Sequence, residues 1–297
     1  MNKWVRRGAV TLTVMVAGAS AAFLTLAELG DRKLQRRVDV AVAPIAMKGD
    51  AASVERGRYL FASRGCGDCH GSAGQGNVVV DDGGMFIRSP DISASPQAAV
   101  ARYKDVDWVR TIRHGVKPDG RPVMVMPSEE YNRLVDSDVA AIVAYARQLP
   151  PASGKPAEVR LPMMVKALYA AGVVRDASEK IDHALPPAQP VAEGVTSEHG
   201  GYVANGCIGC HGQRLEGGKI PGAPPSWPAA AKLNPGPGSA LDRYPSAEPF
   251  MAMLKTGKRP DGSEVSKVMP FVSLKEISEV DARALYLHLR SLPPSGS

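Results

Sequence analysis

The stretch RGCGDCHG, residues 64–71, places two cysteines three positions apart and follows the second directly with a histidine. Closely spaced thiols serve zinc binding, dithiol–disulfide exchange or covalent attachment of haem. His70 adjoins Cys69 directly, so these side chains cannot easily share one tetrahedral zinc ion with Cys66. In a c-type site, two cysteines bond to the porphyrin edge and the adjacent histidine ligates the iron. The motif therefore predicts haem attached at Cys66 and Cys69, with His70 as an axial ligand.

The chain repeats this motif as NGCIGCHG, residues 205–212, with Cys207, Cys210 and His211 in the three functional positions. The two motifs use all four cysteines of the chain, so no thiol remains for a disulfide, a nucleophile or a separate metal site. Structural cysteines or redox-active dithiols are the alternative interpretation of a short motif. We expect two covalently bound haem c groups.

Length and composition suit one haem in each of two domains. The chain has 297 residues, enough for two ordinary domains, and the first cysteines of the motifs lie 141 positions apart. Aromatic residues make up only 5% of the chain, so a buried porphyrin would supply apolar bulk that the side chains lack.

An internal repeat extends well beyond the two cysteine motifs. Three pairs of segments match in the same order: 55–71 with 198–212, 108–127 with 250–270, and 138–151 with 281–294. The first and last segments of each repeat have helical spacing of apolar residues, and the last helix ends at Pro-Pro. Gly57 and Gly200 occupy the same position in the first helix of each repeat. Because glycine weakens a helix, we expect it to permit a close crossing with the last helix.

A methionine followed by proline lies before the last helix of each repeat. His70 precedes Met126 by 56 residues, and His211 precedes Met269 by 58. A thioether opposite histidine raises the reduction potential of haem iron, so we predict His/Met ligation at both haems. Met124 is a competitor for Met126, but it has no counterpart followed by proline. His70 is expected to donate its second ring nitrogen to a carbonyl such as that of Pro90.

His199, close to the second cysteine motif, is expected at the surface rather than beside a haem. No substrate motif is recognisable elsewhere in the chain.

The N-terminus carries an uncharged run of 20 residues, from Gly8 to Ala27. About 20 apolar residues span the hydrocarbon core of a bilayer, so the run predicts a retained membrane anchor. A cleaved signal peptide is the alternative, since small residues at Ala17–Ala22 suit a peptidase. Bacterial haem c assembly takes place outside the cytoplasmic membrane, so residues from about 31 onward are expected in the periplasm.

The positive charge does not indicate a nucleic-acid partner. Residues 1–40 hold seven Lys/Arg and three Asp/Glu, whereas residues 41–297 hold 29 and 27. Most of the formal excess of +6 therefore belongs to the flanks of the anchor, and haem propionates would lower the charge of the remainder.

These features together resemble class I cytochrome c domains. The resemblance rests on Cys-x-x-Cys-His, then SPDI at 89–92, IRHG with Asp-Gly within 112–120, Met-Pro, and an Asp-led helix ending in Leu-Pro. It implies an all-α fold with two tandem class I cytochrome c domains behind an N-terminal transmembrane helix. The expected parts are the anchor at 1–30, a juxtamembrane linker at 31–50, domain 1 at 51–151, an inter-domain linker at 152–192 and domain 2 at 193–297. The linker as a whole is expected to be a tether packed between the domains, and it is expected to contain a short apolar helix at Met163–Ala171.

The duplicated arrangement behind an anchor is similar to the membrane-bound dihaem cytochrome c subunits that serve periplasmic dehydrogenases. That resemblance implies an electron carrier rather than an enzyme on its own. A periplasmic dehydrogenase would donate single electrons, and an oxidase or another cytochrome of the respiratory chain would accept them. A dihaem enzyme, such as a thiosulfate dehydrogenase or a peroxidase, remains the alternative, as does a soluble carrier released by signal cleavage.

Overall fold

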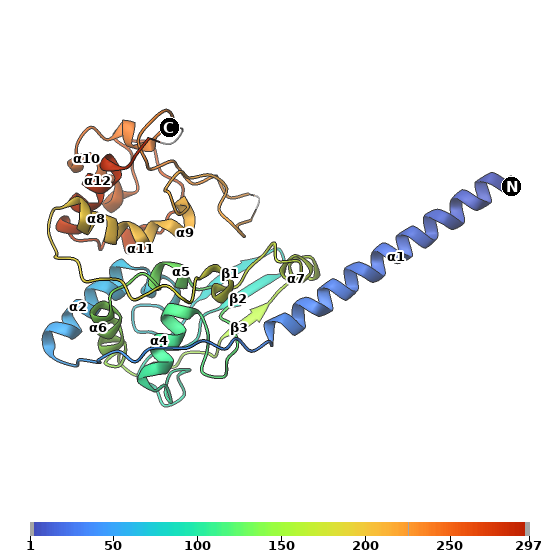
Figure 1. Cartoon of the computed structure of the whole chain (residues 1–297), viewed down its shortest axis with the longest axis horizontal. Coiled ribbons are helices and arrows are strands. Elements are labelled where there is room, and N and C mark those ends of the chain that lie inside the picture. Colours follow the sequence, from blue (N-terminus) through green and yellow to red (C-terminus); the bar gives the residue numbers. More distant parts are fainter. Residues whose placement is uncertain (1–2, 225, 295–297) are drawn as a thin grey trace.

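The computed structural model describes residues 3–224 and 226–294, so the outermost limits of the expected domains, residues 1 and 297, lie outside the described part. Its most prominent element is the long helix α1 (Lys3–Leu34), which projects away from the rest of the molecule (Figure 1). Among the described residues, α1 is the one helix long and apolar enough to cross a membrane; a signal sequence has the same character. The helix extends four residues beyond the expected limit at residue 30.

The first repeat is built around two crossed helices, and its apolar cluster contains Leu60, Val139 and Val143, all fully buried. Asp50 caps the first helix by accepting a hydrogen bond from the Ser53 backbone N–H at 2.8 Å. The helices are α2 (Ala51–Ser63), α3 (Cys66–His70), α4 (Asp105–His114), α5 (Ser128–Tyr131) and α6 (Asp136–Ala146).

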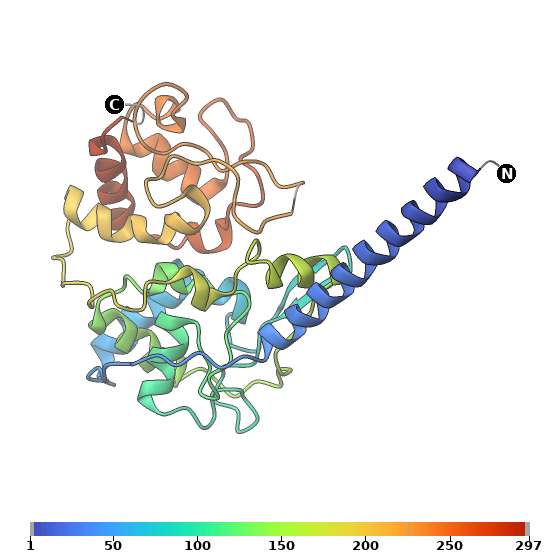
Figure 2. The same ribbon diagram turned by 45° about the vertical axis from the view of Figure 1, so that its right-hand side comes forward.

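The second repeat places its helices in the same order around a second cluster, which includes Leu241, Leu285 and Leu289. Its helical elements are α8 (Ser197–Ala204), η2 (Asn205–Cys207), α9 (Ile208–His211), η3 (Ala240–Arg243), α10 (Ala247–Thr256), α11 (Phe271–Leu274) and α12 (Glu279–Ser291). In Figures 1 and 2 these elements form the upper body, with α9 and α11 on the side that faces the first repeat.

The predicted crossings at the two glycines are confirmed. A Cβ atom on Gly57 would overlap the backbone carbonyl of Ala141 in α6, and one on Gly200 would overlap that of Ala284 in α12. The first and last helices therefore approach each other backbone to backbone in both repeats, which only glycine permits.

The chain is mostly helical, as predicted, but the expectation of an all-α fold omitted a small sheet. Strands β1 (Val78–Asp82), β2 (Met85–Arg88) and β3 (Glu158–Arg160) pair in the order β1-β2-β3, and both pairings are antiparallel. The β-branched run at 78–80 favours a strand. Gly83 and Gly84 both have positive φ, so they form a tight two-residue connection between β1 and β2.

The segment between the repeats contains α7 (Met163–Ala170) and the short η1 (Ala177–Lys180). The predicted helix is present, and it packs against the end of α1. Gly30 of α1 permits this contact, since a Cβ there would overlap the backbone of Lys166. The Lys166 ammonium also donates to Asp31 at 2.8 Å.

Candidate functional site

The first cysteine motif forms the short helix α3, with a glycine in the left-handed region on each side, Gly65 and Gly71. His70 lies at its end, and its Nδ1 is 3.1 Å from the carbonyl oxygen of Pro90. This confirms the predicted contact with Pro90. With Nδ1–H donating to that carbonyl, Nε2 is the nitrogen left for a metal.

The second motif is arranged in the same way. His211 ends α9, and its Nδ1 is 2.7 Å from the carbonyl oxygen of Ala231. In each repeat the accepting carbonyl belongs to the residue 20 positions after the histidine. We did not predict Ala231, although its place in the repeat, opposite Pro90, could have suggested it.

The two motifs lie in surroundings that suit haem better than a reactive thiolate. Burial raises the pKa of the Cys66 thiol and of the Cys207 thiol to about 12. Thiols held neutral in this way are poor nucleophiles and poor ligands for zinc. Burial also lowers the pKa of His70 and His211, which favours the neutral imidazole that coordinates iron.

The structure separates the two methionines that compete in the first repeat. Met126 packs against the apolar cluster that also contacts Cys66, whereas Met124 belongs to a different cluster with Leu161 and Tyr169. In the second repeat, Met269 packs against the cluster that also contacts Cys207. Each Met-Pro methionine thus shares an apolar cluster with a cysteine of its own motif, and these donors fit a haem held between histidine and methionine.

Each cysteine motif also packs against the other repeat. The backbone N–H of Gly209, between Cys207 and Cys210, donates to a carboxyl oxygen of Glu130 in α5 at 3.1 Å. Ser273 of α11 hydrogen-bonds to Asp68, which lies between Cys66 and Cys69. Glu130 and Ser273 occupy matching positions, four residues after Met126 and Met269. The two contacts are therefore equivalent and reciprocal.

A second reciprocal pair of contacts joins the repeats, and we call it the tyrosine–aspartate interlock. It consists of Tyr59 with Asp281 and Tyr202 with Asp138. The hydroxyl of Tyr59 donates to Asp281 at 2.6 Å, and that of Tyr202 donates to Asp138 at 2.7 Å. Each tyrosine also accepts a backbone N–H from just before the partner helix, from Ser278 at 3.2 Å and from Val135 at 3.3 Å.

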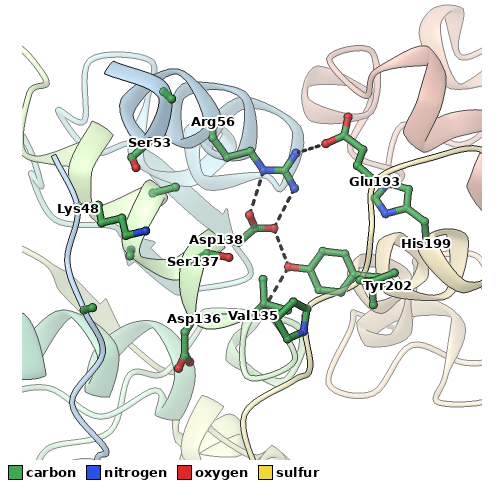
Figure 3. Close-up of a pocket in the computed structure, with 16 residues that line it drawn as sticks. Lys48, Ser53, Arg56, Val135, Asp136, Ser137, Asp138, Glu193, His199 and Tyr202 are labelled. Atoms are coloured by element: carbon green, nitrogen blue, oxygen red, sulfur yellow. Dashed lines mark hydrogen bonds and ion pairs between the residues drawn. The ribbon is translucent and has the colours of Figure 1, made fainter. Parts of the chain in front are cut away.

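An arginine also binds each aspartate of the interlock, and the two arginine side chains differ in exposure. Arg56 binds Asp138 through two nitrogens, each 3.0 Å from a carboxylate oxygen, beside a cavity of ≈ 560 Å³ (Figure 3). Arg64 reaches Asp281 at 2.7 Å, and its side chain is only 7% exposed. Burial favours the neutral acid, but Arg64 and Tyr59 outweigh it and lower the pKa of Asp281.

His199 is the residue that sequence reasoning misplaced. It was expected at the surface, but it is 1% exposed, and its Nε2 lies 2.7 Å from Asp281. The Thr196 side chain caps α8 through the His199 backbone N–H, and the imidazole then points toward the start of α12. The repeat aligns Tyr59 with Tyr202 and Asp138 with Asp281. This alignment did not reveal that each tyrosine binds the aspartate of the other repeat.

Residues 52–145 match the family model described as cytochrome c oxidase, cbb3-type, subunit III. The matched region contains the first cysteine motif and Met126.

Curated relatives cover most of the chain. It is 25% identical to the fructose dehydrogenase cytochrome subunit of Gluconobacter japonicus, over 84% of this chain and 54% of the relative. It is 28% identical to a nicotinate dehydrogenase subunit of Pseudomonas putida, over 84% of this chain and 22% of the relative. It is 27% identical to the cytochrome c subunit of the quinone-type alcohol dehydrogenase of Gluconobacter oxydans, over 84% of this chain and 56% of the relative.

The chain thus spans about half the length of two of these relatives and less of the third. In cytochromes c, haem c is bound covalently at a Cys-x-x-Cys-His motif. Residues 52–145 thus resemble a cytochrome family, and most of the chain is similar to proteins named as cytochrome c subunits of dehydrogenases.

Proposed function

We propose that the protein is a membrane-anchored dihaem cytochrome c that relays single electrons from a periplasmic dehydrogenase toward the respiratory chain. Two tandem class I cytochrome c domains, residues 51–151 and 193–297, each hold one haem. Cys66, Cys69, Cys207 and Cys210 would attach the haems, and His70 with Met126, and His211 with Met269, would hold the iron. Helix α1 holds the protein in the bacterial cytoplasmic membrane with both domains in the periplasm.

The observation that carries this proposal is the reciprocal packing of the two cysteine motifs. Gly209 of the second motif contacts α5 of the first repeat, and Asp68 of the first motif contacts α11 of the second. Porphyrins attached at these motifs would both have an edge near the boundary between the repeats. Short edge separation is what transfer of single electrons between two haems requires.

The residues of the chain set the conditions for that transfer. Bound haem supplies a one-electron Fe(III)/Fe(II) couple. The bonds from His70 to Pro90 and from His211 to Ala231 fix the orientation of each imidazole. The Met126 thioether favours the reduced state, and the apolar cluster around it excludes water. Neither repeat needs to bind a substrate for this role.

The partner proposal rests on the relatives, which are named as cytochrome subunits of fructose and alcohol dehydrogenases and as part of a nicotinate dehydrogenase. We infer that a dehydrogenase donates the electrons and that an oxidase or another cytochrome accepts them.

The test begins with membranes solubilised in mild detergent, from which the protein is isolated by its haem absorbance. We expect a dehydrogenase to co-purify, and its substrate to reduce both haems. If the protein is isolated alone and its haems are reduced by thiosulfate or turn over peroxide, the protein is a dihaem enzyme rather than an electron carrier.

The axial ligands are tested by a matched pair of substitutions. Met126→Leu should lower the midpoint potential of one haem, because the thioether that favours ferrous iron is lost. Met124→Leu, two residues away in a different apolar cluster, should leave both potentials unchanged. The opposite pattern in a redox titration would assign the ligand to Met124.

A further inference from the structure

Helix α7 packs against α1 just beyond the uncharged run of α1. At 1.5 Å per residue, Gly30 is roughly 4.5 Å beyond Ala27, the last residue of that run. The backbone of α7 at Lys166 meets α1 at Gly30. If the run from Gly8 to Ala27 fills the hydrocarbon, this contact lies at the level of the lipid headgroups.

The two helices run in the same direction. Lys166 pairs with Asp31 at 2.8 Å, and further along both helices Lys33 of α1 donates to the carbonyl of Tyr169 of α7 at 2.8 Å. The start of α7 therefore points back toward the uncharged part of α1. Met163, three residues before Lys166, lies at about the level of Ala27. Figures 1 and 2 both place α7 beside the end of α1.

The start of α7 is apolar and uncovered. Met163 is 56% exposed and Met164 is 58% exposed. On α1, Leu26 and Leu29 are 38% and 46% exposed at the same level. We call these four residues the apolar collar. Large exposed apolar side chains gathered beside a membrane helix mark a surface that contacts another apolar phase.

Ion pairs also bind the end of α1 to the rest of the protein, so the collar keeps its position relative to the haem-bearing part. Arg36 forms an ion pair with the buried Asp176 at 2.6 Å, and Lys33 pairs with Glu179 at 2.9 Å. The direction in which α1 enters the bilayer therefore determines which side of the soluble part faces it.

We propose that the apolar collar is a second membrane contact, in which Met163 and Met164 enter the boundary between acyl chains and headgroups. The occupant is the bilayer itself, because the collar is continuous with the surface of α1 that the hydrocarbon would cover. This contact would set the tilt of the haem-bearing body above the membrane. The inference rests on the proposed function in one respect, namely that α1 is retained as an anchor.

The test uses the full-length haem-loaded protein in nanodiscs that contain a lipid with a photoactivatable diazirine near the headgroup end of one acyl chain. After illumination and trypsin digestion, mass spectrometry identifies the peptides that carry lipid adducts. The tryptic peptides of interest are 161–166, which holds both methionines, 8–32 from α1, and 268–275, which holds Val272. Val272 is 65% exposed and lies in α11, which Figure 1 shows in the upper body, away from α1, so its peptide reports labelling from solution.

We expect adducts on peptides 161–166 and 8–32 and none on 268–275. A diazirine at the far end of the acyl chain should label 8–32 alone, because the collar lies at the boundary. Replacing both methionines, Met163→Asp with Met164→Asp, should lower the yield on 161–166 at least five-fold and leave 8–32 unchanged. The matched control Val272→Asp should change neither.

Absence of adducts on 161–166, with 8–32 labelled, would overturn the collar and leave the anchor in place. A purified protein that lacks residues 8–32 would overturn both the anchor and the collar, but not the electron-transfer role, which is measured separately by reduction of the haems.

Discussion

Asp281→Asn should be the most damaging single substitution at the boundary between the repeats. Asp281 is fully buried and accepts hydrogen bonds from Tyr59 at 2.6 Å and from Arg64 at 2.7 Å. Asparagine keeps the shape but removes the charge, so the Arg64 guanidinium, only 7% exposed, is left buried without its counter-ion. Removing one partner of a buried ion pair costs about 3–5 kcal/mol of unfolding free energy.

The equivalent substitution in the first repeat is the matched control. Asp138→Asn removes the same type of contact, but its partner Arg56 is 27% exposed and keeps Glu193 at 3.2 Å. We expect a smaller loss of about 1–2 kcal/mol, because solvent and Glu193 compensate the arginine.

Both variants are compared by guanidinium unfolding in detergent, followed by circular dichroism and by haem absorbance. Electron exchange between the haems, measured after a rapid one-electron reduction, should slow in Asp281→Asn if the interlock fixes their separation. Equal losses of stability in the two variants would refute the argument from burial.

The pH dependence provides an independent check on the same residue. The pKa of Asp281 is lowered in the folded protein, so its carboxylate stabilises the fold at neutral pH. That contribution is lost as the pH falls through the lowered pKa, since the acid then becomes protonated. The difference in stability between the wild type and Asp281→Asn should therefore shrink below about pH 4. A difference that stays constant down to pH 2 would contradict the assignment.

Two further predictions concern packing and a buried acid. Gly200→Ala should destabilise the protein by about 1–3 kcal/mol, because the new Cβ would meet the backbone of α12. Gly201→Ala is the control: its Cβ would meet only the ring of His288, which can move, so this variant should be neutral or stabilised by up to about 1 kcal/mol. Equal unfolding midpoints for the two variants would rule out the crossing. Burial and the neighbouring Glu129 raise the pKa of Glu130 to about 8, so folding at neutral pH takes up a proton there. The stability of the wild type relative to Glu130→Gln should fall as the pH rises from about 5 to 8, by at most about 1.4 kcal/mol per pH unit, and parallel pH profiles would refute this.

The helices of the two repeats and the glycine crossings could be predicted because each rests on a local pattern with one demanding physical requirement. Cys-x-x-Cys-His leaves few chemical alternatives, and a glycine at the same place in two helices requires a close neighbour. The carbonyl of Pro90 was predictable for the same reason, since an axial histidine needs an acceptor for its second nitrogen.

The sequence could not reveal how the two repeats face each other. Tyr59 and Asp281 are 222 positions apart, and their contact depends on the rotation of one repeat against the other, which no local pattern encodes. The burial of His199 was missed for another reason: its partner Asp281 lies in the last helix of the same repeat, 82 positions away, and the sequence did not show which face of α8 packs against that helix. The sheet was missed for a different reason: its third strand, Glu158–Arg160, has only three residues and lies in a segment rich in proline.

We propose above that this chain carries two covalently bound haems behind a retained anchor. The intact mass of the protein purified from membranes tests it most directly. We expect a chain that still contains α1 and whose mass exceeds the polypeptide by two haem groups. A mass that corresponds to one haem, or to none, would contradict it.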